Sequence, residues 1–212
     1  MVFLCWTRPS KEQQKACINR SGSFNYDPRF IGYSAKPQTP PPPSQEESSS
    51  KEENLTRDGF FINRSRVLLG SGPQTFLSAK SALINWRHFG LNWAFVDPET
   101  AVEKGRKFCA CVNEMVVPWV VLPLQIAYVN SSDSSFGFGS GTLHGHLLAG
   151  EERFSVERDE NNQVWYEIYS FSKPAHFLSF MGYPYVRLRQ KFFAQQSSST
   201  ILKHIKSQRS IA

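Results

Sequence analysis

Two histidines and two glutamates lie close together in the chain and are its most promising reactive groups. His144 and His146 flank Gly145, and Glu151 and Glu152 follow a few residues later. Imidazole and carboxylate groups ligate zinc or iron and also act as general acids or bases. His-Gly-His is not a recognised metal spacing, so we favour structural or hydrogen-bonding histidines and predict no metal. A His146–Glu152 pair is either a general base or acid facing a cavity or a buried pair that fixes the loop, and both interpretations remain open.

Glycines and cysteines suggest two other kinds of site, which their spacing does not support. The glycines at 137, 139, 141 and 145 match neither nucleotide-binding glycine pattern, and no helix follows them. Glycine inside a strand more often marks a bulge or a close backbone approach. Cys109 and Cys111 lie two residues apart on one predicted strand, where a disulfide is not favoured. The four cysteines show no disulfide framework, which suits a reducing compartment, so we expect an intracellular, cytoplasmic protein. Plastid association is the alternative, and we expect no cofactor.

Residues 137–174 must position the histidines and glutamates, and they read as three antiparallel strands. Short alternating runs are bounded by glycine and asparagine turns. Because successive side chains point to opposite faces, Glu152 shares the buried face with Phe154 and Val156. Val164, Tyr166 and Ile168 form the matching inward row. A carboxylate placed inward in this way needs a partner, a water-filled cavity or a function.

Residues 59–131 complete the predicted sheet and supply its aromatic interior. We expect a strand at 65–69, a helix that begins at Pro73 and ends by Gly90, and strands near Trp93 and over 108–112. Residues 108–129 are apolar over a membrane-spanning length, but Glu114, Pro118 and Pro123 argue against a transmembrane helix. Two strands around residues 118–119 explain the run, and the second has an inward row at positions 122, 124, 126 and 128.

The first 56 residues divide into an aromatic segment and a polar segment. Residues 1–36 contain a short helix with Ser10 as its N-cap and Gln13 three places on, followed by aromatic residues that we expect to pack on the domain. Residues 37–56 are rich in Pro, Ser and Glu and have almost no apolar anchor, which predicts a disordered linker. The four consecutive prolines are also a possible polyproline ligand, but we favour a spacer.

The C-terminal region combines an apolar helix with all of the chain's net positive charge. Its aromatic and aliphatic residues follow helical spacing, and Gly182 and Pro184 predict a kink or split. Residues 174–212 contain six basic residues and no acidic one, whereas the whole chain has a net charge of +6. Such a face is able to bind nucleic acid or an anionic membrane surface, although solvated basic residues are the ordinary interpretation.

Several stretches resemble the uncharacterised protein family UPF0548. They are GTLHGHLLAGEERF, VWYEIYSFSKP, and the N-terminal FLCWTRPS and FNYDPRF, so the resemblance covers most of the chain except residues 37–54. It directs attention to His146, Gly150, Glu151 and Glu152, which match the family motif. The order of elements is similar to the START-like helix-grip fold, which by itself supports function only weakly.

Together these observations predict one α+β domain over residues 57–208. We expect a curved antiparallel sheet of about six to seven strands that grips a long C-terminal helix. The favoured function is binding of a hydrophobic small molecule or lipid between sheet and helix. The residues expected to bind it are Trp86, Trp93, Tyr128, His144, His146, Glu152 and Tyr166. The alternatives are a cyclase- or hydrolase-like enzyme using His146 and Glu152, and a scaffold or nucleic-acid-associated module using the basic helix.

Overall fold

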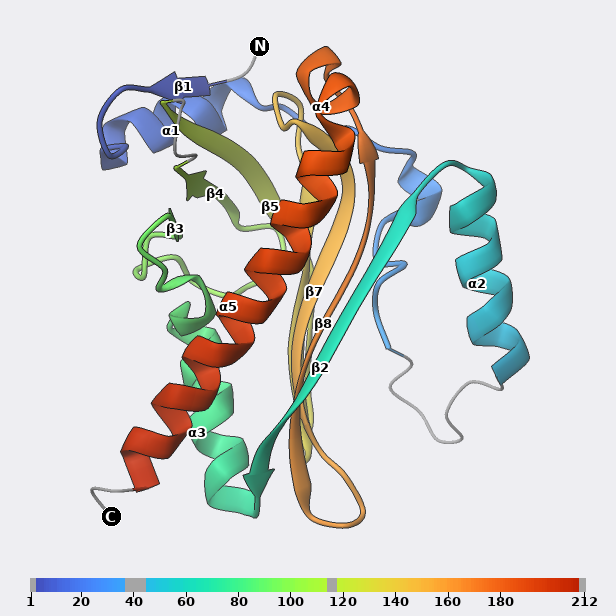
Figure 1. The fold of residues 1–212 in the computed structure, drawn as a ribbon, viewed down its shortest axis with the longest axis vertical. Helices are drawn as coiled ribbons and strands as arrows, with labels where there is room; N and C mark the ends of the chain where they lie inside the picture. Colours follow the sequence, from blue (N-terminus) through green and yellow to red (C-terminus); the bar gives the residue numbers. More distant parts are fainter. Residues whose placement is uncertain (1–2, 37–44, 114–117, 210–212) are drawn as a thin grey trace.

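A curved antiparallel sheet with a long helix across it forms the centre of the computed structural model, which describes residues 3–36, 45–113 and 118–209 (Figure 1). Seven strands follow one another in the order β2-β8-β7-β6-β5-β4-β3, and β1 pairs with β5 at its other edge, beyond the paired part of β6. The strands are β1 (Phe3–Cys5), β2 (Phe61–Ser71), β3 (Ala94–Phe95), β4 (Lys107–Val112), β5 (Trp119–Ser131), β6 (Ser135–Thr142), β7 (Leu148–Arg158) and β8 (Gln163–Pro174).

Strands β6, β7 and β8 confirm the predicted meander and its parity. Phe154 pairs with Phe138 on one side and Ile168 on the other, and all three side chains are fully buried. One step along the strands, Glu152 pairs with Ser140 and with Ser170. Glu152 therefore shares the inner face of the sheet with Phe154, as its parity predicts.

Helices cover the inner face and form the main core with it. α3 (Pro73–Ile84) packs at the lower end in Figure 1, the short helix η2 (Arg87–Phe89) follows it, and α5 (Tyr183–Arg209) crosses the sheet diagonally. The predicted interruption is confirmed, because α4 (Phe177–Met181) ends at Gly182 and α5 begins directly afterwards. The helix-grip architecture expected from the sequence is the one observed.

The N-terminal residues cover the outer face of the sheet. They form α1 (Lys11–Arg20) and the short helix η1 (Pro28–Phe30), and the predicted capping box of Ser10 and Gln13 is present. Glycines of β6 permit this close layer: a Cβ at Gly141 would overlap the rings of Tyr26 and Phe24, and one at Gly139 would overlap Tyr128. The predicted close backbone approach at these glycines is therefore confirmed.

Two expectations need correction. The predicted disordered linker is wrong over residues 45–56, which belong to helix α2 (Gln45–Arg57); Leu55 anchors it by complete burial beside Phe30 and Phe60. The remainder of that segment, 37–44, lies outside the described residues. The inward row of β5 is also wrong at its end, because a bulge between Ile126 and Tyr128 turns Tyr128 to the outer face.

Candidate functional site

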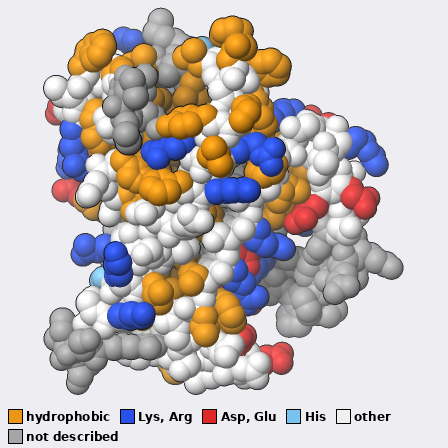
Figure 2. Space-filling model, in the orientation of Figure 1, with side chains coloured by type: hydrophobic (Ala, Val, Ile, Leu, Met, Phe, Trp, Pro, Cys, Tyr) orange, Lys and Arg blue, Asp and Glu red, His pale blue; other side chains and the backbone are white. Residues whose placement is uncertain are grey.

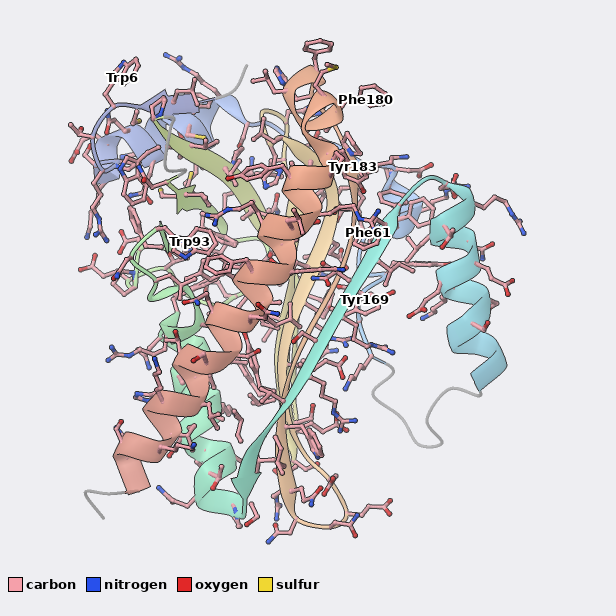
Figure 3. All side chains as sticks on the ribbon, in the orientation of Figure 1. Trp6, Phe61, Trp93, Tyr169, Phe180 and Tyr183 are labelled. Atoms are coloured by element: carbon pink, nitrogen blue, oxygen red, sulfur yellow. The ribbon has the colours of Figure 1, made fainter. Side chains whose placement is uncertain are left out.

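A cavity of about 530 Å³ lies between the upper half of the sheet and helices α4 and α5. Its walls are predominantly apolar and include Ala110 and Leu122 from the sheet, Trp93 before β3, and Leu178, Tyr185 and Phe193 from the helices. Figure 3 shows Trp93 pointing towards α5 from the opposite side of this space. Sheet and helix are thus packed together at the lower end and separated at the upper end.

The size of the side chains on successive strand pairs explains why the space is hollow only at one end. In the lower half, the row Phe138, Phe154 and Ile168 fills the interior together with Trp86 and His88. In the upper half, the corresponding row is Ser140, Glu152 and Ser170, and the next one includes Gly150 and Ser172. Two serines and a glutamate replace three large apolar residues, so less side-chain volume fills the space between the sheet and α5 there.

Gly150 is a required part of this wall. Its φ is +152°, and a Cβ at this position would overlap the carbonyl oxygen of Phe171 on the neighbouring strand. Its backbone N–H donates to the hydroxyl of Thr142, 2.9 Å away. The position therefore excludes side chains, because any Cβ would collide with the backbone of β8.

In the described part of the sheet, Glu152 is the one residue whose carboxyl group points into the cavity. Its side chain is half-buried because part of it borders the empty space, and no hydrogen bond or ion pair joins it to any described residue. Burial raises the pKa of the Glu152 carboxyl to about 8. At neutral pH the group is therefore mainly an uncharged carboxylic acid, which is able both to donate and to accept a hydrogen bond.

His146 lines the same cavity but does not pair with Glu152. His146 Nδ1 lies 2.9 Å from the backbone nitrogen of Leu148 and 3.1 Å from the Leu148 carbonyl oxygen, so the backbone of Leu148 engages this ring nitrogen in either tautomer. Burial lowers the pKa of His146 to about 4, so the imidazole is neutral at pH 7. Within the described ranges no hydrogen bond or ion pair connects the two side chains, and the geometry does not form the hypothesised acid–base pair.

The other predicted binding residues fall into three groups. Trp93 borders the cavity, and the Arg189 guanidinium stacks 4.1 Å above its ring centre. Trp86 and Tyr166 lie in the solid part of the core: the Trp86 indole donates to Thr100 O at 2.8 Å, and the Tyr166 hydroxyl bonds to Ser197 Oγ at 2.8 Å. Neither borders the cavity.

Tyr128 and His144 lie outside the cavity altogether. The bulge in β5 places the Tyr128 hydroxyl on the outer face, 2.7 Å from Ser34 Oγ. His144 is exposed in the loop before β7. Among the residues that the structure describes, no three His, Cys, Asp or Glu side chains are placed to hold a metal ion.

Glu151, the neighbour of Glu152, belongs to a different environment. It is only 2% exposed and accepts hydrogen bonds from Gly32 N (2.8 Å), Ser34 N (2.9 Å), Ser34 Oγ and Tyr26 Oη (3.1 Å). These donors all come from the N-terminal layer. Glu151 therefore fastens that layer to the outer face of β7, and adjacent glutamates serve opposite faces of one strand.

Three polar residues of the cavity were not foreseen. Ser140 and Ser170 flank Glu152, and the Gln190 amide on α5 donates from Nε2 to Ser172 Oγ at 3.0 Å. Gln190 Oε1 is buried without a partner in the described structure. The alternation of side chains along β8 places Ser170 on the same face as Ile168, so its position was predictable. The position of Ser140 depends on the register of β6, and that of Gln190 depends on the rotation of α5, and the sequence specifies neither.

Known protein families and relatives match this chain over most of its length. Residues 44–200 match the model of a domain of unknown function, DUF1990. A UPF0548 protein of Arabidopsis thaliana is 57% identical over 211 residues, covering 97% of this chain and 98% of that protein. A UPF0548 protein of Dictyostelium discoideum is 30% identical over 226 residues, covering 99% of each.

Among solved structures, the fold is similar to that of the di-domain ARO/CYC protein StfQ from the steffimycin biosynthetic pathway. The TM-score is 0.51 at 7% sequence identity, and the match covers 77% of this chain and 56% of that chain. At this identity the likeness concerns the fold alone. No helix in the described ranges has the length and apolar character needed to cross a membrane.

Proposed function

This chain belongs to the DUF1990 family, and we propose that it binds an uncharged amphipathic small molecule in the cavity between sheet and helix. The observation that carries the proposal is the cavity itself, with a volume of about 530 Å³ and largely apolar walls. Small-molecule sites in proteins have volumes of roughly 300–1,000 Å³ and combine such walls with a few placed polar groups.

The polar groups define how the ligand lies. Ser140, Glu152 and Ser170 form one row across three strands, and Gln190 Oε1 is a buried acceptor on the helix side. A buried acceptor or donor without a partner costs free energy, which a ligand's polar end recovers by bonding to it. The apolar part of the ligand then extends along Leu122, Phe193 and Trp93 towards the mouth.

The charge state of the site favours an uncharged ligand. With the pKa of Glu152 raised to about 8 and that of His146 lowered to about 4, both groups are mainly neutral at pH 7. A cation or anion beside Glu152 and His146 loses its hydration without gaining a counter-charge from either group, and the Arg189 guanidinium that borders the cavity lies over the ring of Trp93. A hydroxyl, carbonyl or amide at the polar end meets hydrogen-bonding partners without that cost.

A competition among three ligands of equal chain length tests the proposal. Dodecan-1-ol, dodecylamine and dodecanoate differ only in the charge of the polar end at pH 7. Native mass spectrometry of the protein in an equimolar mixture should show predominantly the alcohol, bound one to one. Preferential retention of the amine or the carboxylate would contradict the uncharged class, and retention of none of the three would contradict the proposal.

The enzymatic alternative has no such supporting observation. His146 and Glu152 border one cavity, but the Nδ1 atom of His146 is occupied by the Leu148 backbone and no bond joins the two side chains. General acid–base catalysis requires groups within hydrogen-bond reach of the reacting atoms. We therefore propose a binding function.

A further inference from the structure

Helix α4 presents its apolar residues to solvent and its polar residue to the protein. Phe177 is 71% exposed, Phe180 70% and Met181 67%, whereas Ser179 is 1% exposed. The Ser179 hydroxyl lies 2.6 Å from Leu147 O and 2.7 Å from His176 O, which holds this orientation. A surface helix normally has the opposite arrangement, so these exposed apolar side chains indicate an interaction surface.

The exposed apolar surface extends beyond α4. Tyr185 and Leu188 continue it along the first turns of α5, and Leu4 and Trp6 add to it from the N-terminal segment. Figure 3 places Trp6 and Phe180 at the same end of the molecule, both pointing away from its body. Leu4, Leu178 and Tyr185 also border the cavity, so this surface surrounds its mouth.

Basic side chains adjoin this surface without acidic neighbours on the same segment. Figure 2 shows exposed hydrophobic side chains at the upper end of the molecule, with Lys and Arg side chains directly below them. Arg187 and Lys191 are exposed on α5, and residues 174–212 contain no Asp or Glu. Exposed aromatic and aliphatic residues bordered by cations are the combination that binds an anionic lipid surface.

We propose that the apolar surface around the cavity mouth, formed by Leu4, Trp6, Phe177, Leu178, Phe180, Met181, Tyr185 and Leu188, inserts into the interface of an anionic lipid bilayer. The adjacent Arg187 and Lys191 contact the lipid phosphates. In this orientation the mouth opens towards the acyl chains, and an amphipathic ligand passes between bilayer and cavity without crossing water.

Flotation with lipid vesicles tests the surface directly. The protein should bind vesicles of phosphatidylcholine with 30% phosphatidylglycerol and bind pure phosphatidylcholine vesicles much more weakly. Replacing two exposed apolar residues, Phe180→Ser with Met181→Ser, should weaken binding by roughly tenfold or more. The matched control is Leu77→Ser with Ile84→Ser, which removes two exposed apolar residues from α3 and should leave binding unchanged.

Two double variants on α5 test the electrostatic contribution to vesicle binding. Arg187→Gln with Lys191→Gln should weaken binding to the anionic vesicles roughly tenfold, and added salt should weaken wild-type binding. Lys203→Gln with Lys206→Gln removes the same charge from the far end of α5 and should have little effect.

Three results would overturn the proposal. They are absence of wild-type binding to the anionic vesicles, an equal loss in the α4 and α3 variants, and heparin binding of equal strength that the α4 substitutions do not alter. The last would indicate a general polyanion surface. The assay uses no cavity ligand, so its outcome is independent of the proposed ligand binding.

Discussion

Glu152 is a carboxyl group with no ion pair or hydrogen bond among the described residues, and its burial determines its protonation. The folded-state pKa of about 8 exceeds the ordinary value of 4.5. Between these pH values Glu152 is protonated in the folded protein and ionised in the unfolded chain, so folding takes up a proton. The associated stability is fully present below about pH 4.5 and is lost as the pH rises through 8.

Replacing Glu152 with glutamine should therefore remove a pH-dependent cost. We expect Glu152→Gln to raise the free energy of unfolding by about 1–3 kcal/mol at pH 8 and to change it little at pH 4.5. Urea unfolding at the two pH values measures both numbers. A variant less stable than wild type at pH 8 would show instead that Glu152 has a supporting hydrogen-bond partner.

The same ionisation should change which ligand binds. As pH rises from 7 to 9, Glu152 becomes an anion, so dodecan-1-ol should bind more weakly and the still-cationic dodecylamine more tightly. In Glu152→Gln both affinities should be nearly constant over this range. Titration of each ligand at the two pH values provides the measurement, and parallel changes in variant and wild type would contradict the role of Glu152.

His88 is a second neutral titratable group, buried in the solid half of the core. Both ring nitrogens lack a partner among the described residues, and the ring lies against Trp86 and Phe154. Complete burial lowers the pKa of His88 to about 3 from an ordinary 6.5.

His88 should therefore contribute to acid unfolding. Above pH 6.5 its contribution to stability is fully present, and it is lost as the pH falls towards 3, by up to about 1.4 kcal/mol per pH unit. The variant His88→Leu should be less sensitive to pH in this window, as measured by urea unfolding at pH 7 and pH 5. An unchanged pH dependence would show that other groups dominate.

At the scale of elements, strand β6 has glycine at alternate positions, so its outward face has no side chains over this stretch. Its outward positions 137, 139 and 141 are glycines. A Cβ would meet Ser155 of β7 at Gly137, Tyr128 of β5 at Gly139, and Tyr26 and Phe24 of the outer layer at Gly141. The sequence signals a close approach there, but only the structure identifies the approaching residues, Tyr26 and Tyr128 among them.

Substitution of one such glycine tests this layer. Gly141→Ala should reduce the free energy of unfolding by about 1–3 kcal/mol, because the new methyl group displaces the rings of Tyr26 and Phe24. It should also speed proteolysis within residues 3–36 relative to wild type. Ser135→Ala at the start of β6 is the control, and equal effects of the two substitutions would contradict the argument.

Elements whose residues alternate or repeat regularly were predictable, and those governed by tertiary contact were not. The parity of β7, the Ser10 cap and the break at Gly182 follow from local patterns. The bulge that reverses Tyr128 has no local signal, because Ala127 fits a regular strand equally well. Helix α2 likewise depends on the burial of Leu55 against distant aromatic residues, which a polar local composition conceals.

At the scale of the whole molecule, one sheet separates a partly hollow interior from an outer layer that packs on it through two apolar clusters and through hydrogen bonds to Glu151. The sequence predicted that sheet and helix enclose a site with Glu152, His146 and Trp93, and these three residues do border the cavity. It also assigned Trp86, Tyr128 and Tyr166 to the site, because aromatic content indicates an interior but not which half of it is filled.

We propose that the upper half of this interior binds an uncharged amphipathic molecule, and filling the cavity should abolish that binding. Ala110 borders the cavity on β4, so Ala110→Trp should fill much of it, and Val120→Phe is a second filling variant should the first not fold. Ala101→Trp adds the same side chain at an exposed position and is the control.

Fluorescence titration with 1-aminoanthracene, which is uncharged at pH 7, is the most direct measurement. We expect saturable one-to-one binding to wild type and to Ala101→Trp, displacement by dodecan-1-ol, and loss of binding in the filled variants. Absence of saturable binding to wild type, or equal binding by a folded variant whose cavity is filled, would contradict it.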